Sequence, residues 1–243
     1  MVSDSLRRSF NKWAFGTRCR NADVARILRP YVEQGSNLLD AGCGEYGLST
    51  FVSKSNVVGL DILRSEESSD QFTFILGSIT ALPFAGRSFS VAASVDVFEH
   101  LPVEVRKAAV RELVNVSKSA IVITFPSGSG ARRMDEEFHK ALIDRKQPIP
   151  DWVSEHLANQ YPEPDEIVDE IEKVASMNGR KVRTAIYYSE ALVMSKLVRW
   201  AALNSRFLYF AGNLVAGFLL PVLPEAKKHD AYRTIVLAEF HND

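Results

Sequence analysis

The chain has 243 residues, enough for one large α/β domain with a substantial core but too few to favour two independent domains. Acidic and basic residues nearly balance, with a formal net charge of -1, so the composition gives no reason to expect a nucleic-acid partner. Cys19 and Cys43 show neither disulfide nor metal-ligand spacing, which favours a reducing, cytoplasmic environment.

The first half of the chain predicts a mostly parallel sheet with helices on both faces. Residues 1–35 lack the apolar run of a signal peptide and are interpreted as an N-terminal helical lead. Residues 36–127 then alternate short β-rich runs with helical ones. Strands are expected at residues 37–42, 56–62, 72–78, 90–98 and 119–127, and helical runs at 48–54 and 102–118. Four of the five strand runs are almost continuously apolar, as expected for strands covered on both faces.

Two further segments read as helical insertions into the same single domain. Residues 128–162 are polar, charged and interrupted by prolines, and residues 189–230 have a helical pattern. Between and after them we expect a helix at 165–179, with Gly179 at its C-terminal end, and strands at 181–188 and 232–240. The insertions are expected to build a binding site, or a lid over one, on the sheet.

An uncharged stretch of 17 residues, 207–223, lies in the second insertion. A membrane-spanning helix needs about 20 apolar residues, and Asn213 and Pro221 further weaken that interpretation. Two readings stay open. The stretch is either buried, against the sheet or in a homodimer interface, or it is an apolar lid that contacts a membrane or a lipid-linked substrate.

The segment DAGCGEYG places glycines directly after a predicted strand. Gly42, Gly44 and Gly47 let the backbone turn tightly and approach a ligand closely. The next strand ends in Asp61, about 20 residues after the turn, where a carboxylate can bind ribose hydroxyls. The arrangement predicts a nucleotide-like cofactor.

Acidic residues gather at the predicted carboxyl edge of the sheet, where open α/β sheets bind ligands. They are Asp40, Glu45, Asp61, Asp96 and Glu99. Carboxylates would repel the pyrophosphate of a dinucleotide in a low-dielectric cleft. S-adenosylmethionine instead carries a sulfonium and an ammonium and no phosphate, so these acids favour it. A nicotinamide-dependent oxidoreductase and a non-enzymatic binding module stay as alternatives.

These motifs resemble those of class I S-adenosylmethionine-dependent methyltransferases. LLDAGCGEYG resembles the family's first motif, VVGLDI the second, and GSITALPFAGRSFSVAASVDVFEHLP the stretch from the adenine-binding loop to the EHL sequence. The resemblance covers residues 37–126 and the closing strands. It implies the Rossmann-like methyltransferase fold, S-adenosylmethionine as cofactor and methyl transfer as the activity.

The resemblance also implies roles for residues of the turn and of the second strand. Gly42 and Gly44 pass under the methionine part of the cofactor, and Asp40 supports the turn and the cofactor's amino group. Asp61 binds the ribose.

Three later residues complete the cofactor site that the resemblance implies. Ser78 and Ile79 flank the adenine, and Asp96 faces the methionine end or the substrate. Many family members have an acid where Ser78 stands, and a serine offers a weaker, neutral hydrogen bond.

His100, in VFEHLP, is the candidate catalytic residue. A neutral imidazole at the mouth of the cleft can take a proton from an acceptor hydroxyl. The same pair of residues occurs in family members with unrelated substrates, so support of the loop is the alternative role. His139 and His156 are backup candidates in the first insertion. No spacing typical of metal ligands is present, and no metal site is expected.

The expected acceptor is a small molecule or a glycan, modified by O-methylation, because the balanced charge gives no nucleic-acid patch. The segment DWVSEHLANQYPEPDEI is similar to methyltransferases that modify glycans or other secondary metabolites. Trp152, Tyr161, Tyr187 and Tyr188 are candidates for lining the acceptor pocket, with core packing as the alternative.

Overall fold

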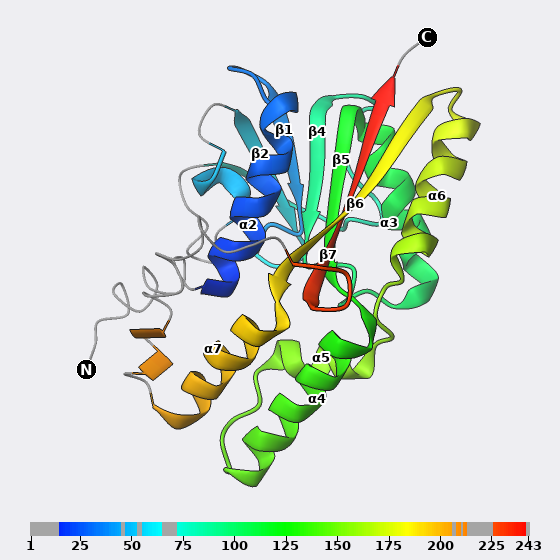
Figure 1. The fold of residues 1–243 in the computed structure, drawn as a ribbon. Helices are drawn as coiled ribbons and strands as arrows, with labels where there is room; N and C mark the ends of the chain where they lie inside the picture. Colours follow the sequence, from blue (N-terminus) through cyan, green and yellow to red (C-terminus); the bar gives the residue numbers. More distant parts are fainter. Residues whose placement is uncertain are drawn as a thin grey trace.

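A seven-stranded sheet forms the centre of the molecule (Figure 1). The structure is a computed structural model and describes residues 15–44, 47–52, 55–64, 72–205, 208–209, 211–212 and 226–241. The strand order is β3-β2-β1-β4-β5-β7-β6. The strands are β1 (Asn37–Ala41), β2 (Asn56–Asp61), β3 (Thr73–Leu76), β4 (Phe89–Val95), β5 (Ser117–Pro126), β6 (Lys181–Ala191) and β7 (Ala231–His241). All seven expected strands are therefore present.

The first five strands are parallel, and β7 runs antiparallel to both β5 and β6. The mostly parallel α/β sheet predicted from the sequence is confirmed. In the register of the sheet, Asp40 of β1 pairs with Gly59 of β2 and Ala93 of β4. The carboxyl ends of these three strands consequently meet at one edge, where Asp61 ends β2 and Asp96 follows β4.

Helices cover both faces of the sheet (Figure 1). α2 covers one face and α3 and α6 cover the other. Among the described residues the helices are α2 (Phe15–Leu28), α3 (Val103–Val116), α4 (Gly128–Asp144), α5 (Asp151–Ala158), α6 (Pro164–Met177) and α7 (Leu192–Asn204), with short 3-10 turns η1 (Arg29–Tyr31) and η2 (Leu48–Thr50). Leu38 packs with α2 on one face, whereas Leu39 packs with α3 and α6 on the other. Successive side chains of a strand point to opposite faces, so a run that is apolar throughout becomes a strand buried on both sides.

The amphipathic helices α3 and α6 lie close to their predicted positions. Ala109, Leu113 and Ile171 are fully buried in the cluster that these helices form with the sheet. Gly179 follows α6 with φ +64, and the amide of Arg180 donates to the carbonyl of Ala175. The positive φ favours glycine at this position, as the sequence predicted for the end of the helix.

The prediction of a helical run at residues 48–54 is wrong for the residues that the structure describes. Among the described residues this run is only the single turn η2, after which the amides of Phe51 and Val52 both donate to the carbonyl of Leu48. Serine and the β-branched residues threonine and valine have low helix propensity, and this segment contains all three.

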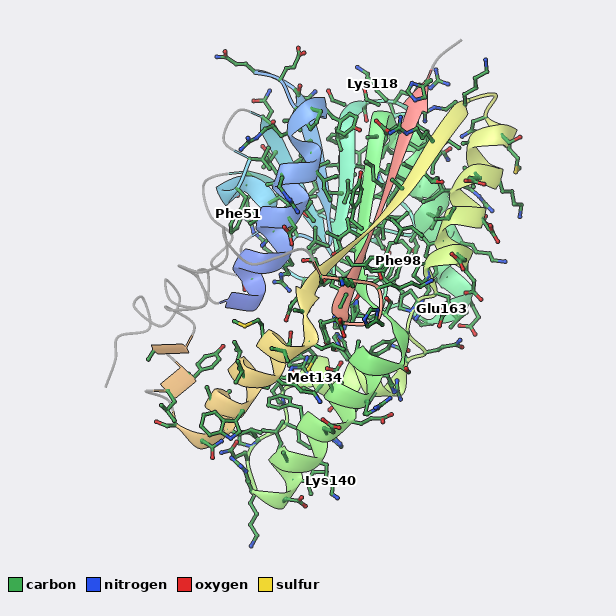
Figure 2. The ribbon with its side chains drawn as sticks, viewed as in Figure 1. Phe51, Phe98, Lys118, Met134, Lys140 and Glu163 are labelled. Carbon is green, nitrogen blue, oxygen red and sulfur yellow. The ribbon has the colours of Figure 1, made fainter. Side chains whose placement is uncertain are left out.

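α4, α5 and α7, which fall in the two segments predicted to be insertions, lie beyond the carboxyl edge of the sheet (Figure 1). Met134 of α4 lies in this layer and packs with Tyr161 and Tyr232, whereas Lys118 marks the opposite edge (Figure 2). Most of the uncharged stretch 207–223 falls outside the described residues, so its predicted role does too. Within the described part of the chain, no helix has the length and apolar character needed to cross a membrane.

Candidate active site

Two cavities open at the carboxyl edge of the sheet and share a wall. The turn cavity, of about 490 Å³, is lined by the glycine turn and the ends of β2 and β4. The helical cavity, of about 510 Å³, is lined by residues of α2, α4, α5, α7 and β7. Arg20, Asp96 and His100 line both cavities. A ligand in one cavity can therefore meet a ligand in the other at these three residues.

The glycine turn is shaped by close backbone packing. Gly42 has φ +84, and a Cβ atom there would lie 2.2 Å from a methyl carbon of Val97. Its amide donates to the carbonyl of Leu60 over 2.7 Å. Gly44 has φ +55 and open space around it, and its amide donates to Oδ2 of Asp61 over 2.9 Å. The turn is thus hydrogen-bonded to the end of β2 and packs closely against Val97, which follows β4.

Asp40 supports this turn from beneath. Its carboxylate is 1% exposed, and Oδ2 accepts the amide hydrogen of Leu48 over 2.6 Å. A side chain at Gly47 would bring its Cβ within 2.9 Å of the same oxygen. Burial raises the pKa of Asp40 to about 6, and the hydrogen bond from Leu48 only partly opposes this.

The residues expected to hold the ribose and the adenine line the turn cavity. Asp61 is half-buried, and its Oδ1 accepts the amide hydrogen of Leu63 over 3.2 Å. Ser78 and Ile79 lie on the same wall, but the Ser78 hydroxyl is 2.8 Å from the hydroxyl of Thr80 and accepts the Thr80 amide. Glu45 lies outside the described residues.

Asp96 lies on the shared wall with an unusual backbone, φ +55. Its two oxygens accept hydrogen bonds from Arg233, Nε to Oδ1 at 2.7 Å and Nη2 to Oδ2 at 2.5 Å. Thr124 donates to Oδ1 as well. Burial alone would raise the pKa of Asp96, but Arg233 holds it well below its usual range. Asp96 is therefore a carboxylate whose main partner is a protein side chain.

Arg233 connects Asp96 to a second buried acid, and sequence reasoning missed it. Its guanidinium also bonds Glu190, which has φ +59 and accepts the hydroxyl hydrogen of Ser195 over 2.5 Å. Arg233 lies 137 residues beyond Asp96 in the chain. No local pattern marks that pairing.

His100 is held on the shared wall by a carboxylate. Its Nδ1 lies 2.5 Å from Oε2 of Glu155, and 30% of its side chain is exposed. Burial and the nearby His156 lower the pKa of His100, while Glu155 acts in the opposite direction. A carboxylate only accepts hydrogen bonds, so Nδ1 carries the proton and the neutral ring has its lone pair on Nε2.

His156 and Glu99 lie beside His100 in the wall of the helical cavity. His156 is buried, and its Nδ1 is 2.9 Å from Oδ2 of Asp135. Glu99 is 0% exposed, and neither of its oxygens has a hydrogen-bond partner among the described residues. Burial, with the charge of Asp96, raises the pKa of Glu99 well above its usual range. Sequence spacing predicted no metal site, but the fold brings ligand atoms of Glu99, His100 and His156 within 4.8 Å of one another.

Asp135 is the centre of the layer that forms the helical cavity. It is fully buried in α4 and accepts hydrogen bonds from four side chains. These donors are His156, Tyr161, Arg199 and Tyr232. They come from α5, the segment after it, α7 and β7, so one carboxylate joins the elements around the cavity.

The aromatic candidates divide between wall, core and surface. Trp152 lines the helical cavity and stacks on Phe138, with ring centroids 6.1 Å apart. Tyr161 is buried and bonds Asp135. Tyr187 is exposed on the edge strand β6, and Tyr188 lies on the same strand. Only Trp152 of the four lies on the cavity wall.

Comparisons with known proteins agree with this geometry. Residues 39–123 match the model of the methyltransferase domain family. A TehB-like SAM-dependent methyltransferase from Corynebacterium glutamicum superposes with a TM-score of 0.53 at 15% identity, covering 97% of this chain and 95% of that one. A SAM-dependent methyltransferase from Archaeoglobus fulgidus gives 0.52 at 17% identity, covering 90% and 94%. A search of curated proteins finds no match.

The sheet and its glycine turn have the fold of class I S-adenosylmethionine-dependent methyltransferases, and the matched domain agrees. The match of residues 39–123 to the methyltransferase domain supports S-adenosylmethionine-dependent methyl transfer and favours it over the oxidoreductase and non-enzymatic alternatives. The turn cavity fits the cofactor: Asp40, Asp61 and Asp96 line it, and Arg20 is the only cationic side chain among its described wall residues. Such a wall suits a cationic ligand without phosphate.

Proposed function

We propose that the protein methylates a hydroxyl group of a small, polar, glycan-type acceptor bound in the helical cavity. The observation that carries this proposal is the wall that the two cavities share at His100. S-adenosylmethionine, when bound in the turn cavity, supplies an electrophilic methyl group. The protein's part is to orient the acceptor and to exclude water.

The wall of the helical cavity suits a neutral, hydroxylated ring. Trp152 and Phe138 offer flat apolar surfaces, and charged groups around them offer hydrogen bonds. Two of the three arginines of the wall are hydrogen-bonded to carboxylates: Arg233 bonds Asp96 and Glu190, and Arg199 bonds Asp135. The third, Arg20, lies 3.6 Å from Oδ2 of Asp96. An anionic acceptor would have to compete with these buried carboxylates, so a neutral acceptor is favoured.

His100 is proposed as the general base. Glu155 fixes the proton on Nδ1, which leaves the Nε2 lone pair for the acceptor hydroxyl. Because its pKa is lowered, the ring is neutral near pH 7 and available to take the proton. As the acceptor oxygen bonds the methyl carbon, the carbon–sulfur bond breaks and S-adenosylhomocysteine leaves.

The cofactor contacts are proposed as the family resemblance implies them. Gly42 and Gly44 pass under the methionine part and Asp61 binds the ribose, with Asp40 behind the turn. The same proposal sets the adenine against Ser78 and Ile79 and the reacting end near Asp96. All seven line the turn cavity, which supports this assignment.

The test measures S-adenosylhomocysteine release with three acceptor panels: sugars and hydroxylated metabolites, amines, and carboxylates. Turnover only with hydroxylated compounds is expected. His100→Gln should lower kcat about 100-fold or more and leave cofactor affinity unchanged. The matched variant is His139→Gln, which changes a half-buried histidine of α4 and should leave kcat unchanged. Turnover confined to amines or carboxylates would exclude O-methylation, and normal kcat in His100→Gln would exclude the base.

Two further proposals concern location and partners. We propose that the protein is cytoplasmic. We also assign the stretch 207–223 to a homodimer contact or to contact with a lipid-linked acceptor, and the lack of charge in this stretch supports that assignment. Light scattering separates monomer from dimer, and flotation with vesicles of anionic lipid tests membrane contact. A monomer that stays off the vesicles would remove both assignments.

A further inference from the structure

Three side chains with metal-binding chemistry converge on the wall of the helical cavity. Nε2 of His156 lies 3.7 Å from Oε1 of Glu99, and Nε2 of His100 lies 4.0 Å from the same oxygen. The two imidazole rings have centroids 4.9 Å apart. Glu99 and His100 follow β4, whereas His156 comes from α5, so the cluster forms only in the folded chain.

Both histidines have a carboxylate next to Nδ1 and direct Nε2 toward Glu99. Nδ1 of His100 faces Glu155, and Nδ1 of His156 faces Asp135. Each carboxylate holds the ring proton on Nδ1, so in the neutral rings both Nε2 lone pairs face Glu99. Histidines that bind metals almost always have such a partner on the other nitrogen, because it fixes the tautomer and the direction of the ring.

Glu99 supplies the second, independent observation. Its carboxylate is fully buried, it lines the helical cavity, and neither oxygen has a hydrogen-bond partner among the described residues. A buried carboxylate without a partner is costly unless it takes up a proton or a cation. The two lone pairs that face Glu99 cannot donate a hydrogen bond to its carboxylate. Glu99 therefore takes up either a proton or a cation, and two imidazole nitrogens directed at the same point favour the cation.

We propose that Glu99, His100 and His156 bind a divalent first-row transition-metal ion, with Zn²⁺ as the best match. Two imidazoles and a carboxylate are ligands of zinc or iron, whereas Mg²⁺ and Ca²⁺ take oxygen ligands. Ligands about 2.1 Å from a tetrahedral ion lie about 3.4 Å apart. The two separations from Glu99, 3.7 and 4.0 Å, are longer than this, and all three ligand atoms lie within 4.8 Å of one another. The side chains therefore move slightly inward when the ion binds.

Three protein ligands leave a coordination position open, and all three residues line the helical cavity. A catalytic role of the ion rests on the proposed function. In that role, an acceptor hydroxyl that contacts the ion becomes more acidic and releases its proton to solvent, and its oxygen then bonds the methyl carbon. His100 is then a ligand, and its role as base is confined to the metal-free protein. Metal binding itself does not depend on which acceptor is methylated.

The experiment begins with untagged protein freed of metal by a chelator and then titrated with Zn²⁺, Co²⁺ or Mg²⁺ by calorimetry. One Zn²⁺ or Co²⁺ per chain is expected, with visible absorption of tetrahedral Co²⁺, and no binding of Mg²⁺. Glu99→Gln and His100→Ala should each weaken Zn²⁺ binding at least 100-fold. Glu155→Gln should weaken it about 10-fold, because it removes only the orienting partner.

The matched control is His229→Ala. His229 is exposed and lies 3.0 Å from Asp230, so it is a pair that can bind metal adventitiously at the surface. Zn²⁺ affinity should not change in this variant. Circular dichroism and S-adenosylmethionine titration check that each variant is folded, and the half-exposed His100 offers a test even if Glu99→Gln fails that check.

The inference is overturned if wild-type protein binds no Zn²⁺ or Co²⁺, or if Glu99→Gln and His100→Ala, once folded, bind like wild type. It is equally overturned if His229→Ala abolishes binding. Metal binding without any hydroxyl methylation would retain the site and remove the proposed function. Full O-methylation by metal-free protein, alongside Zn²⁺ binding, would retain the site and return His100 to the role of base.

Discussion

The turn cavity and the helical cavity are built by different means. Around the turn cavity, the shape depends on backbone: Gly42 and Gly44 adopt positive φ, and Asp40 and Asp61 accept backbone amides. Around the helical cavity it depends on side chains, with Asp135 and Arg233 joining elements far apart in the chain. A backbone-shaped cavity suits a ligand that does not vary, as proposed for the cofactor. A cavity shaped by side chains can be altered by substitution, as expected for the proposed acceptor site.

The largest effect should come from Asp135→Ala. Removing a buried carboxylate with four donors leaves Arg199 without its carboxylate partner and should lower the free energy of unfolding by about 3–5 kcal/mol. Urea unfolding measures it. Glu137→Ala is the control on the same helix, because its ion pair with Lys196 is exposed and contributes about 1 kcal/mol at most. An equal cost for both variants would mean that Asp135 does not hold this layer together.

A second test uses the buried acid of the turn. Burial raises the pKa of Asp40 to about 6, above its value of about 3.9 in the unfolded chain. Between these values the folded protein binds more protons than the unfolded one, so stability falls as pH rises from about 4 to about 6. Ionised Asp40 thus costs up to about 3 kcal/mol at pH 7.

Asp40→Asn does not titrate and isolates this contribution. The free energy of unfolding of the variant minus that of wild type, measured by urea at several pH values, should rise from pH 4 to pH 7. Other titrating groups cancel in the difference. A difference that stays flat would show that the Asp40 carboxyl has the same pKa in both states.

The two cavities also differ in how far sequence could predict them. Asp40, Gly42, Gly44 and Asp61 lie within 22 residues on one strand–turn–strand unit, so periodicity and turn chemistry were enough to place them together. The strands were also predictable from local sequence, because a strand that is buried on both faces is a continuous apolar run.

The helical cavity had no comparable local signal. His156 is 57 residues from Glu99, and Arg233 is 137 from Asp96. These contacts depend on how α5 and β7 dock, which sequence spacing does not encode. Polar, proline-rich composition predicted the presence of the insertion but not its buried network. The expectation that no metal site is present rested on the same local reasoning.

A smaller effect separates two glycines of the turn. Gly42→Ala forces a Cβ to 2.2 Å from Val97 at a φ of +84, whereas Gly44→Ala has a positive φ but no atom within 4 Å. The left-handed conformation costs each variant about 1–2 kcal/mol. Only Gly42→Ala must also displace Val97. Calorimetry should therefore show that Gly42→Ala lowers the affinity for S-adenosylmethionine at least 10-fold more than Gly44→Ala does. Equal losses would mean that the turn moves freely away from β4.

The smallest effect compares two side chains of the turn cavity. Asp61→Ala removes the carboxylate that is proposed to accept hydrogen bonds from the ribose hydroxyls, and a hydrogen bond to a charged group contributes about 1.5–3 kcal/mol. Ser78→Ala removes a neutral hydroxyl that already bonds Thr80, so about 0.5 kcal/mol or less should be lost. Cofactor affinity should therefore fall more than 10-fold in the first variant and about twofold in the second. If Ser78→Ala weakened cofactor binding more than Asp61→Ala, the Ser78 hydroxyl would have to leave Thr80 and bind the adenine. Cofactor binding would then depend on this side chain as well as on the backbone of the glycine turn.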